Sequence, residues 1–224
     1  MIDGETKGEK VFIPVVVSVS GMTDLVYNDF YVADGADVTI VAGCGIHNGG
    51  CNDSRHDGIH TFHVGKNANV RYEEKHYGEG NGTGQRILNP VTNIEIGENS
   101  VFTLDTVQIK GVDSTIRTTN VVMDANSKLF VLERLMTDGD QKAESDIEVC
   151  MTEAVLPHRL FHVLSERVIP PRSSIPRQSA KQMPRPYPVR FYHHGSRTGR
   201  IYSGDPGKTC GCGNHPRGGD RTDQ

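Results

Sequence analysis

Short runs of alternating hydrophobic and polar residues follow one another along the first two thirds of the chain. Each run has the length of a strand, is rich in β-branched residues and ends at a Gly, Asn or Asp turn. The runs read KVFIPVVVSVS, DVTIVAG, GIHTFHVG, NVRYEEKHYG, NIEIG, VFTLDTVQIKG, TTNVVMD and KLFVLERLM. The pattern favours no amphipathic helix before residue 140, so we expect an all-β fold.

A repeat is superimposed on these strands. Four segments share a small polar start, then Ala or Ser, then alternating hydrophobic positions, and they centre on Ala36, Ala68, Ser100 and Ser127. The spacings of 32, 32 and 27 residues are typical of stacked units that bury their hydrophobic faces against one another. The pattern predicts a parallel β-helix, with a β-sandwich as the alternative.

The charge divides the chain in two. Residues 1–149 carry 12 Lys and Arg against 23 Asp and Glu, whereas residues 150–224 carry 12 against 5 and hold nine of the 11 prolines. We therefore predict a β-helical core over 1–149 and an irregular, disordered tail over 150–224.

The composition also limits the compartment. The sequence contains no hydrophobic run long enough for a transmembrane helix, and its polar start, MIDGETKGEK, lacks the apolar segment of a secretory signal. We expect a cytoplasmic protein without membrane contact, in which the five cysteines are reduced.

The residues best suited to bind a metal or to react lie between Val41 and Gly65, where two cysteines and four histidines occur. Cys44 and Cys51 are too far apart for the tight pairs of closed zinc sites. Two interpretations stay open: a metal site, or a small buried Cys44 with solvated or hydrogen-bonded histidines. Alternation puts His60 on one face of its strand and His63 on the other. Neither a phosphate-binding loop nor a nucleophile motif is present, so no enzyme activity is predicted.

Several blocks of the core resemble the SufB/SufD scaffold proteins of the SUF iron–sulfur cluster assembly system, and most of all their short archaeal and anaerobe members. The blocks are DLVYNDFYVADGADVTIVAGCGIHN, HDGIHTFHVGKNANVRYEEKHYGEG, ILNP and QIKGVDSTIRTTNVVMDANSKLFVLERLMTDGDQKAESDIEV, in family order within residues 10–149. The resemblance implies a right-handed parallel β-helix without catalytic activity of its own. It also implies a SufC-like ABC-type ATPase partner, sulfur supply from a cysteine desulfurase or sulfur-transfer partner, and a transient iron–sulfur cluster.

The resemblance also suggests site residues. Cys44 occupies the position of a family cysteine in a Gly-Cys context and is the main sulfur-handling candidate, with Cys51 second. His60 and His63 are weaker candidate metal ligands. Thiolates accept sulfur and bind iron, and imidazole is a more easily released ligand.

The tail departs from the family, which should continue with a block resembling GHIQCDSIIMD. Read one base forward, the codons of Pro186–Phe191 permit HIQCDS and those of Tyr192–Gly195 permit IIMD. We therefore interpret residues 150–224 as an out-of-frame remnant of the family C-terminus, and we expect weakened ATPase binding.

Iron–sulfur scaffolding is the function that the sequence favours. The alternatives are a metal- or sugar-binding β-helix protein unrelated to cluster assembly, and a nucleic-acid-binding protein that uses the basic tail. The iron–sulfur scaffold interpretation predicts no contact with nucleic acid. Self-association is expected, because the open end of a solenoid exposes strand edges.

Overall fold

Every element in the described part of the chain is a strand. The computed structural model describes residues 1–151, 161–168 and 189–193. The strands are β1 Lys7–Val17, β2 Thr23–Val32, β3 Asp37–His47, β4 Ser54–Val64, β5 Asn69–Glu79, β6 Arg86–Leu88, β7 Val91–Ile96, β8 Val101–Gln108, β9 Ser114–Met123, β10 Lys128–Met136, β11 Lys142–Met151, β12 Phe161–Val168 and β13 Val189–His193.

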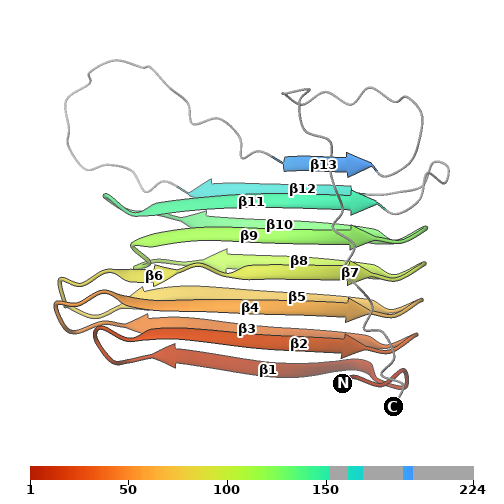
Figure 1. Ribbon diagram of the computed structural model, residues 1–224, viewed down its shortest axis with the longest axis horizontal. Coiled ribbons are helices and arrows are strands. Elements are labelled where there is room, and N and C mark those ends of the chain that lie inside the picture. Colours follow the sequence, from red (N-terminus) through yellow and green to blue (C-terminus); the bar gives the residue numbers. More distant parts are fainter. Residues whose placement is uncertain (152–160, 169–188, 194–224) are drawn as a thin grey trace, which may run out of the picture.

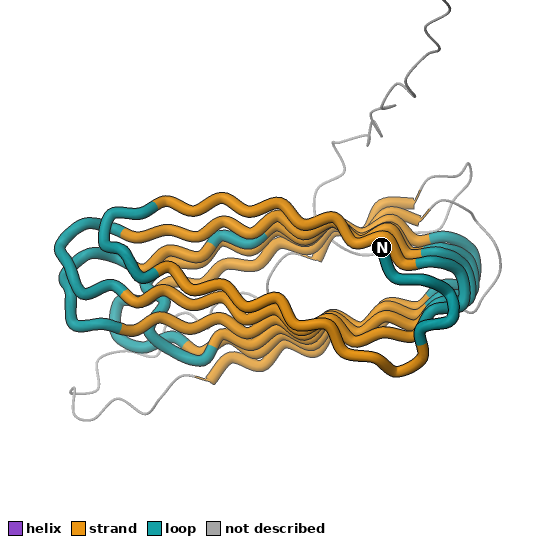
Figure 2. The backbone as a smooth tube through the Cα atoms, turned by 90° about the horizontal axis from the view of Figure 1, so that it is seen from below, coloured by secondary structure: helices purple, strands orange, loops and turns teal. Residues whose placement is uncertain are grey.

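The strands form two parallel sheets that lie face to face. One sheet has the order β1-β3-β5-β8-β10-β12; the other has the order β13-β11-β9-β6-β4-β2, with β7 between β4 and β9. Successive strands alternate between the sheets, except that β6 and β7 follow one another in the second sheet. The chain thus coils upward from β1, and the end-on view shows a flattened coil (Figures 1 and 2). The predicted β-helix is thus confirmed, and the all-parallel pairing excludes a β-sandwich.

The repeat found in the sequence sets the register of this coil. Val38 pairs with Val70 and Val70 with Phe102, each 32 residues on, and Phe102 pairs with Leu129, 27 residues on. Each spacing therefore corresponds to one turn of the coil.

Each repeat position lies at a corner between the sheets. The four side chains, those of Ala36, Ala68, Ser100 and Ser127, are buried. The residue before each has a positive φ: Gly35 at 76°, Asn67 at 54°, Asn99 at 61° and Asn126 at 56°. Gly and Asn tolerate this left-handed conformation best, which explains why they recur there.

The interior holds a main hydrophobic core, buried polar groups and a second, smaller hydrophobic cluster. Near the corners, side chains such as Ile40, Phe62, Tyr72 and Phe102 form the main hydrophobic core. Phe62 packs against Tyr72 and Phe102 with ring centroids 4.8 Å and 5.2 Å apart. Farther along the strands, ionisable and polar groups take many inward positions. A second, smaller hydrophobic cluster is buried there too, formed by Val17, Cys44, Ile46, Leu88 and Val112.

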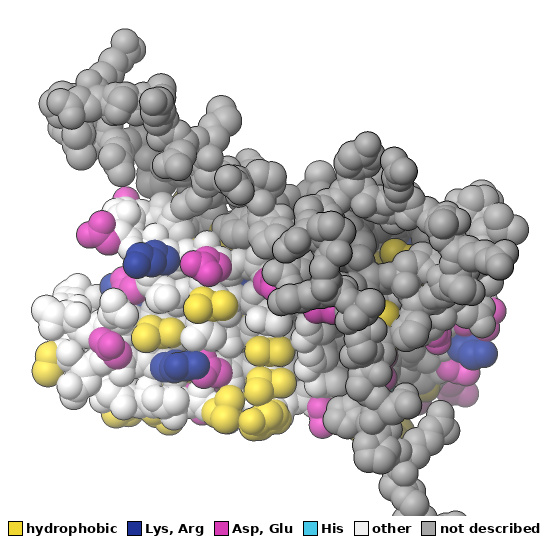
Figure 3. All heavy atoms as spheres, turned by 45° about the horizontal axis from the view of Figure 1, so that its top comes forward, with side chains coloured by type: hydrophobic (Ala, Val, Ile, Leu, Met, Phe, Trp, Pro, Cys, Tyr) yellow, Lys and Arg dark blue, Asp and Glu magenta, His cyan; other side chains and the backbone are white. Residues whose placement is uncertain are grey.

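The first turn of the coil is exposed along one edge. Among the described strands, β1 pairs only with β3, and outward-facing Phe12, Val16 and Tyr27 are 66%, 56% and 66% exposed. Hydrophobic side chains gather along the lower edge in Figure 3, whereas the charged side chains are more scattered over the visible face.

Some boundaries differ from the sequence prediction. The hydrophobic runs did not single out β2 or β11, and β1 ends at Val17 rather than near Gly21. In the predicted tail, β12 and β13 each add one strand to a sheet. The remainder of the tail (152–160, 169–188 and 194–224) lies outside the described residues.

In the part that the structure describes, no helix is long and apolar enough to cross a membrane.

Candidate functional site

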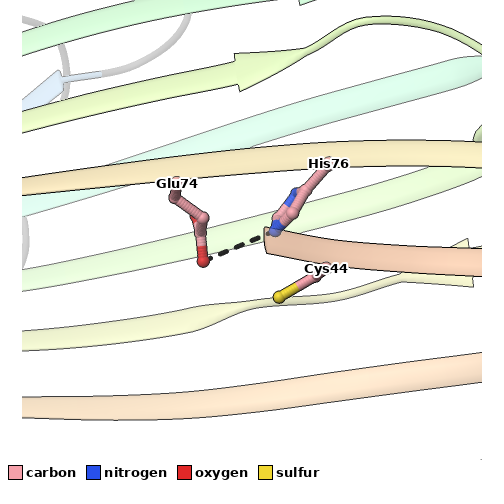
Figure 4. Close-up of side chains that lie close together, drawn as sticks. All are labelled: Cys44, Glu74 and His76. Atoms are coloured by element: carbon pink, nitrogen blue, oxygen red, sulfur yellow. Dashed lines mark ion pairs between the residues drawn. The ribbon is translucent and has the colours of Figure 1, made fainter. Parts of the chain in front are cut away.

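Three potential ligands converge on the inner face of one sheet. Cys44 on β3 and His76 on β5 are direct partners in register, and Glu74 lies two residues earlier on β5. Because side chains two residues apart share a face, Glu74 and His76 project together into the interior. One ligand atom of each of the three residues lies within 4.8 Å of the others, and all three side chains are buried (Figure 4).

Cys44 is a protonated thiol in this setting. It is 2% exposed, and burial, with a contribution from the nearby Glu74 carboxylate, raises the pKa of the thiol to about 12. Nucleophilic attack and metal binding both require the thiolate. The Cys44 thiol therefore has low reactivity until a cation or a structural opening favours its deprotonation.

Arg117 on β9 joins the two sheets through a buried ion network. Its guanidinium bonds Glu74 through Nη1, and its Nε lies 3.3 Å from Oε1 of Glu133. Tyr72 donates to Glu74 Oε1 at 3.1 Å, and Ser145 donates to Glu133 at 2.9 Å.

The protonation states in this network are set by charge pairing. Burial opposes the charge of Glu74, but the N–H of His76 and the permanent charge of Arg117 outweigh it and hold the pKa of the carboxyl well below its usual range. Burial lowers the pKa of His76, although Glu74 opposes that shift. We therefore describe Glu74 as ionised and His76 as neutral.

The opposite sheet contributes two more imidazoles. His56 and His60 on β4 are each 3% exposed, and they line one narrow void together with Cys44, Glu74, His76, Gly58, Leu88 and Pro90. His56 Nδ1 lies 2.8 Å from Asp24 Oδ2, and His60 Nδ1 lies 3.3 Å from the amide nitrogen of Asn28. Burial lowers the pKa of His60, which favours its neutral form.

The structure separates the residues that the sequence proposed. Cys44 and His60 line the same void, as a shared site would require. Cys51 lies exposed in the loop between β3 and β4. His63 faces outward, as alternation predicted, where it stacks on Tyr31 and lies 2.7 Å from Glu95. Neither Cys51 nor His63 contributes to the void.

The sequence contained a signal for the residues that were missed. Glu74, His76 and Arg117 were not candidates, yet position 76 follows Cys44 by 32 residues, the length of one turn. The repeat would have placed His76 beside Cys44, and alternation would have added Glu74. Arg117 reaches the site from the other sheet, and no spacing in the sequence predicts contacts across the interior.

Thiol, imidazole and carboxylate donors in a narrow interior void form a mixed set that suits iron or zinc. Comparisons of the chain with protein-family models, with curated proteins and with solved structures gave no match, so no related protein indicates what this donor set binds.

Proposed function

We propose that this protein is a scaffold component for iron–sulfur cluster assembly, which receives sulfur and iron on cysteine thiolates. The observation that supports the proposal is the position of Cys44. The cysteine that the SufB/SufD resemblance selects lies inside the coil beside Glu74 and His76. Thiolate favours iron and sulfide, whereas imidazole and carboxylate are weaker ligands from which iron can be passed on.

The state of Cys44 adds a condition to this function. A thiol whose pKa is raised to about 12 is a poor sulfur acceptor at neutral pH. Sulfur transfer onto Cys44 therefore requires iron to bind first and stabilise the thiolate, or a partner to open the coil. Exposed Cys51 is accessible to a sulfur donor without any opening.

The partners follow from the same proposal. A SufC-like ABC-type ATPase would supply the conformational work, and a cysteine desulfurase or sulfur-transfer protein would supply sulfur. Because the family's closing region is not readable in residues 150–224, we propose that this chain binds the ATPase weakly. Normal-yield co-purification of the two would contradict that part of the proposal.

The function is tested by anaerobic reconstitution of the full chain with ferrous iron, sulfide and reductant. The expected result is visible absorption from thiolate-ligated iron–sulfur units, reduced in Cys44→Ser. Folded chain that takes up no iron would refute the function. Metal binding without any sulfide-dependent absorption would instead support a metal-binding β-helix protein.

The nucleic-acid alternative has its own test. Binding of DNA or RNA to the full chain that disappears when residues 150–224 are deleted would support it, because the basic residues concentrate there.

A further inference from the structure

Two imidazole nitrogens point at one place inside the coil. A Cβ built on Gly58 would lie 2.8 Å from His60 Nε2 and 3.4 Å from His56 Nε2. Glycine at position 58 thus leaves open the space onto which both histidines converge. Cys44 and Glu74 line the same space from the facing sheet.

One of these nitrogens lacks a partner. His60 is 97% buried, and its Nε2 makes no hydrogen bond. A buried polar atom without a partner costs free energy, and native proteins avoid it except where a ligand or a functional need accounts for it. His60 is therefore the independent sign that the void is built for an occupant.

Hydrogen-bond roles decide which side chains can act as ligands. The carboxylate of Asp24 only accepts, so Nδ1 of His56 carries the proton and Nε2 keeps its lone pair. Imidazoles that bind metals are commonly held by a carboxylate in this way. Nδ1 of His60 lies 3.3 Å from the side-chain amide nitrogen of Asn28, so Nε2 of His60 can bind an ion only when that amide turns and accepts from Nδ1 through its oxygen. His76 has no such alternative, because Arg117 Nη2 donates to its Nδ1 at 3.2 Å and guanidinium offers no acceptor. Its Nε2 then carries the proton and faces Glu74 at 3.4 Å.

We propose that this void binds one divalent transition-metal ion, Fe²⁺ or Zn²⁺, through the Cys44 thiolate, the Glu74 carboxylate and Nε2 of both His56 and His60. His76 and Asp24 orient these ligands and do not bind the ion. Metal binding transfers the Cys44 proton to solvent, and the ion takes its place as the partner of sulfur. The site needs no sulfide, so it goes beyond cluster assembly.

Two of the four proposed donors already lie close together. Zinc sites hold their donor atoms about 2.0–2.3 Å from the ion. Cys44 and Glu74 already have ligand atoms within 4.8 Å of each other. For these two donors an ion requires inward movements on the order of an ångström. His56 and His60 line the same void from the facing sheet and would have to approach the ion across it.

The test is an anaerobic titration of the full chain with Co²⁺, without sulfide. Every variant carries Cys210→Ser and Cys212→Ser, so that the cysteines of the tail cannot bind the probe. We expect one Co²⁺ per chain, with visible d–d bands and near-ultraviolet thiolate-to-cobalt absorption. Zn²⁺ should displace it.

Substitutions at the void locate the ion. Cys44→Ser should remove the thiolate-to-cobalt absorption, and His60→Gln and His56→Gln should each weaken binding at least about tenfold. Gly58→Ala keeps every ligand but fills the space between the imidazoles, and it should also abolish binding. The matched controls, Cys51→Ser and His63→Gln, should leave the affinity and spectrum unchanged.

Two results would overturn the site. The first is a folded parent chain, as judged by its β-type circular dichroism, that binds no Co²⁺. The second is an unchanged spectrum and affinity in folded Gly58→Ala and His60→Gln. If Cys44→Ser fails to fold, Gly58→Ala and His60→Gln still test whether the ion binds in the void. Cobalt binding without cluster reconstitution would refute only the scaffold function; the reverse result would refute only this site.

Discussion

At the scale of single residues, the interior of the coil keeps ionisable groups where packing alone would favour hydrophobic ones. Cys44, Glu74 and Arg117 are all buried, and each has its pKa shifted by burial and by its neighbours. Burial of charge is unfavourable unless partners compensate it. The free energy of unfolding should therefore respond strongly to changes in these groups.

The first prediction concerns Cys44 and pH. Its folded pKa is raised from 9.0 to about 12, so between these values the folded state binds more protons than the unfolded state. The thiol's contribution to the free energy of unfolding is fully present below about pH 9 and then falls by about 1.4 kcal/mol per pH unit toward pH 12. Urea denaturation of the parent, Cys44→Ala and Cys51→Ala across this range measures it. Only Cys44→Ala should flatten the decline; an equally steep curve in that variant would contradict the shift.

The second prediction concerns Arg117. Arg117→Met leaves Glu74 and Glu133 buried without their cation, and should lower the free energy of unfolding by about 3–5 kcal/mol. Adding Glu74→Gln and Glu133→Gln should restore part of the loss. Arg55→Met is the matched control, because Arg55 pairs with Asp57 at 46% side-chain exposure and should cost less than about 1 kcal/mol. Similar losses in both arginine variants would argue against the buried network.

At the scale of elements, the corners explain why the fold could be predicted. A left-handed Gly or Asn precedes each buried Ala or Ser. Local turn chemistry and the one-turn spacing therefore both predict the same corners of the coil. Strand β2 was missed because outward Leu25 and Tyr27 are as hydrophobic as inward Val26, which hides the alternation. The candidate site was predicted only through Cys44 and His60, because contacts between facing sheets leave no periodic signal.

The third prediction tests a corner. Asn99 has φ 61°, so Asn99→Ala should lower the free energy of unfolding by about 1 kcal/mol, the cost of a left-handed residue with an ordinary side chain. Asn99→Gly should be neutral within a few tenths of a kcal/mol. Gly35→Asn makes the reverse exchange at φ 76° and should also be tolerated. Chemical denaturation measures all three; a neutral Asn99→Ala would show that the corner conformation is not what selects Asn.

At the scale of the whole molecule, the exposed first turn leads to the fourth prediction. The outer edge of β1 is unpaired among the described residues, and Phe12 and Val16 beside it are exposed. Such edges template pairing with other chains, so we expect concentration-dependent association in sedimentation velocity. The double variant Phe12→Lys, Val16→Lys should reduce it. Ile116→Lys is the control, because Ile116 is exposed but its strand β9 has neighbouring strands on both sides. Equal association of all three proteins would place the interface elsewhere.

The fifth prediction concerns the change in composition near residue 150. Acidic residues dominate before this point, whereas Arg and Pro dominate after it, and no packing requirement of a β-helix explains the change. Out-of-frame reading of GC-rich codons produces Arg, Pro and Gly freely. Over Pro186–Gly195 the degenerate codons, read one base forward, can encode ten consecutive residues of the block that the SufB/SufD resemblance requires next.

Resequencing of the gene decides the matter. We expect missing or inserted bases near codon 149 and again near codon 185, and a corrected frame that encodes HIQCDSIIMD. The corrected chain should then bind the ABC-type ATPase better than the present one, because the docking region would be restored. A single degenerate tripeptide could match by chance, but ten residues in order constrain the codons at every step. An uninterrupted frame that reproduces the present tail would end the hypothesis and make the basic C-terminus a genuine part of the protein.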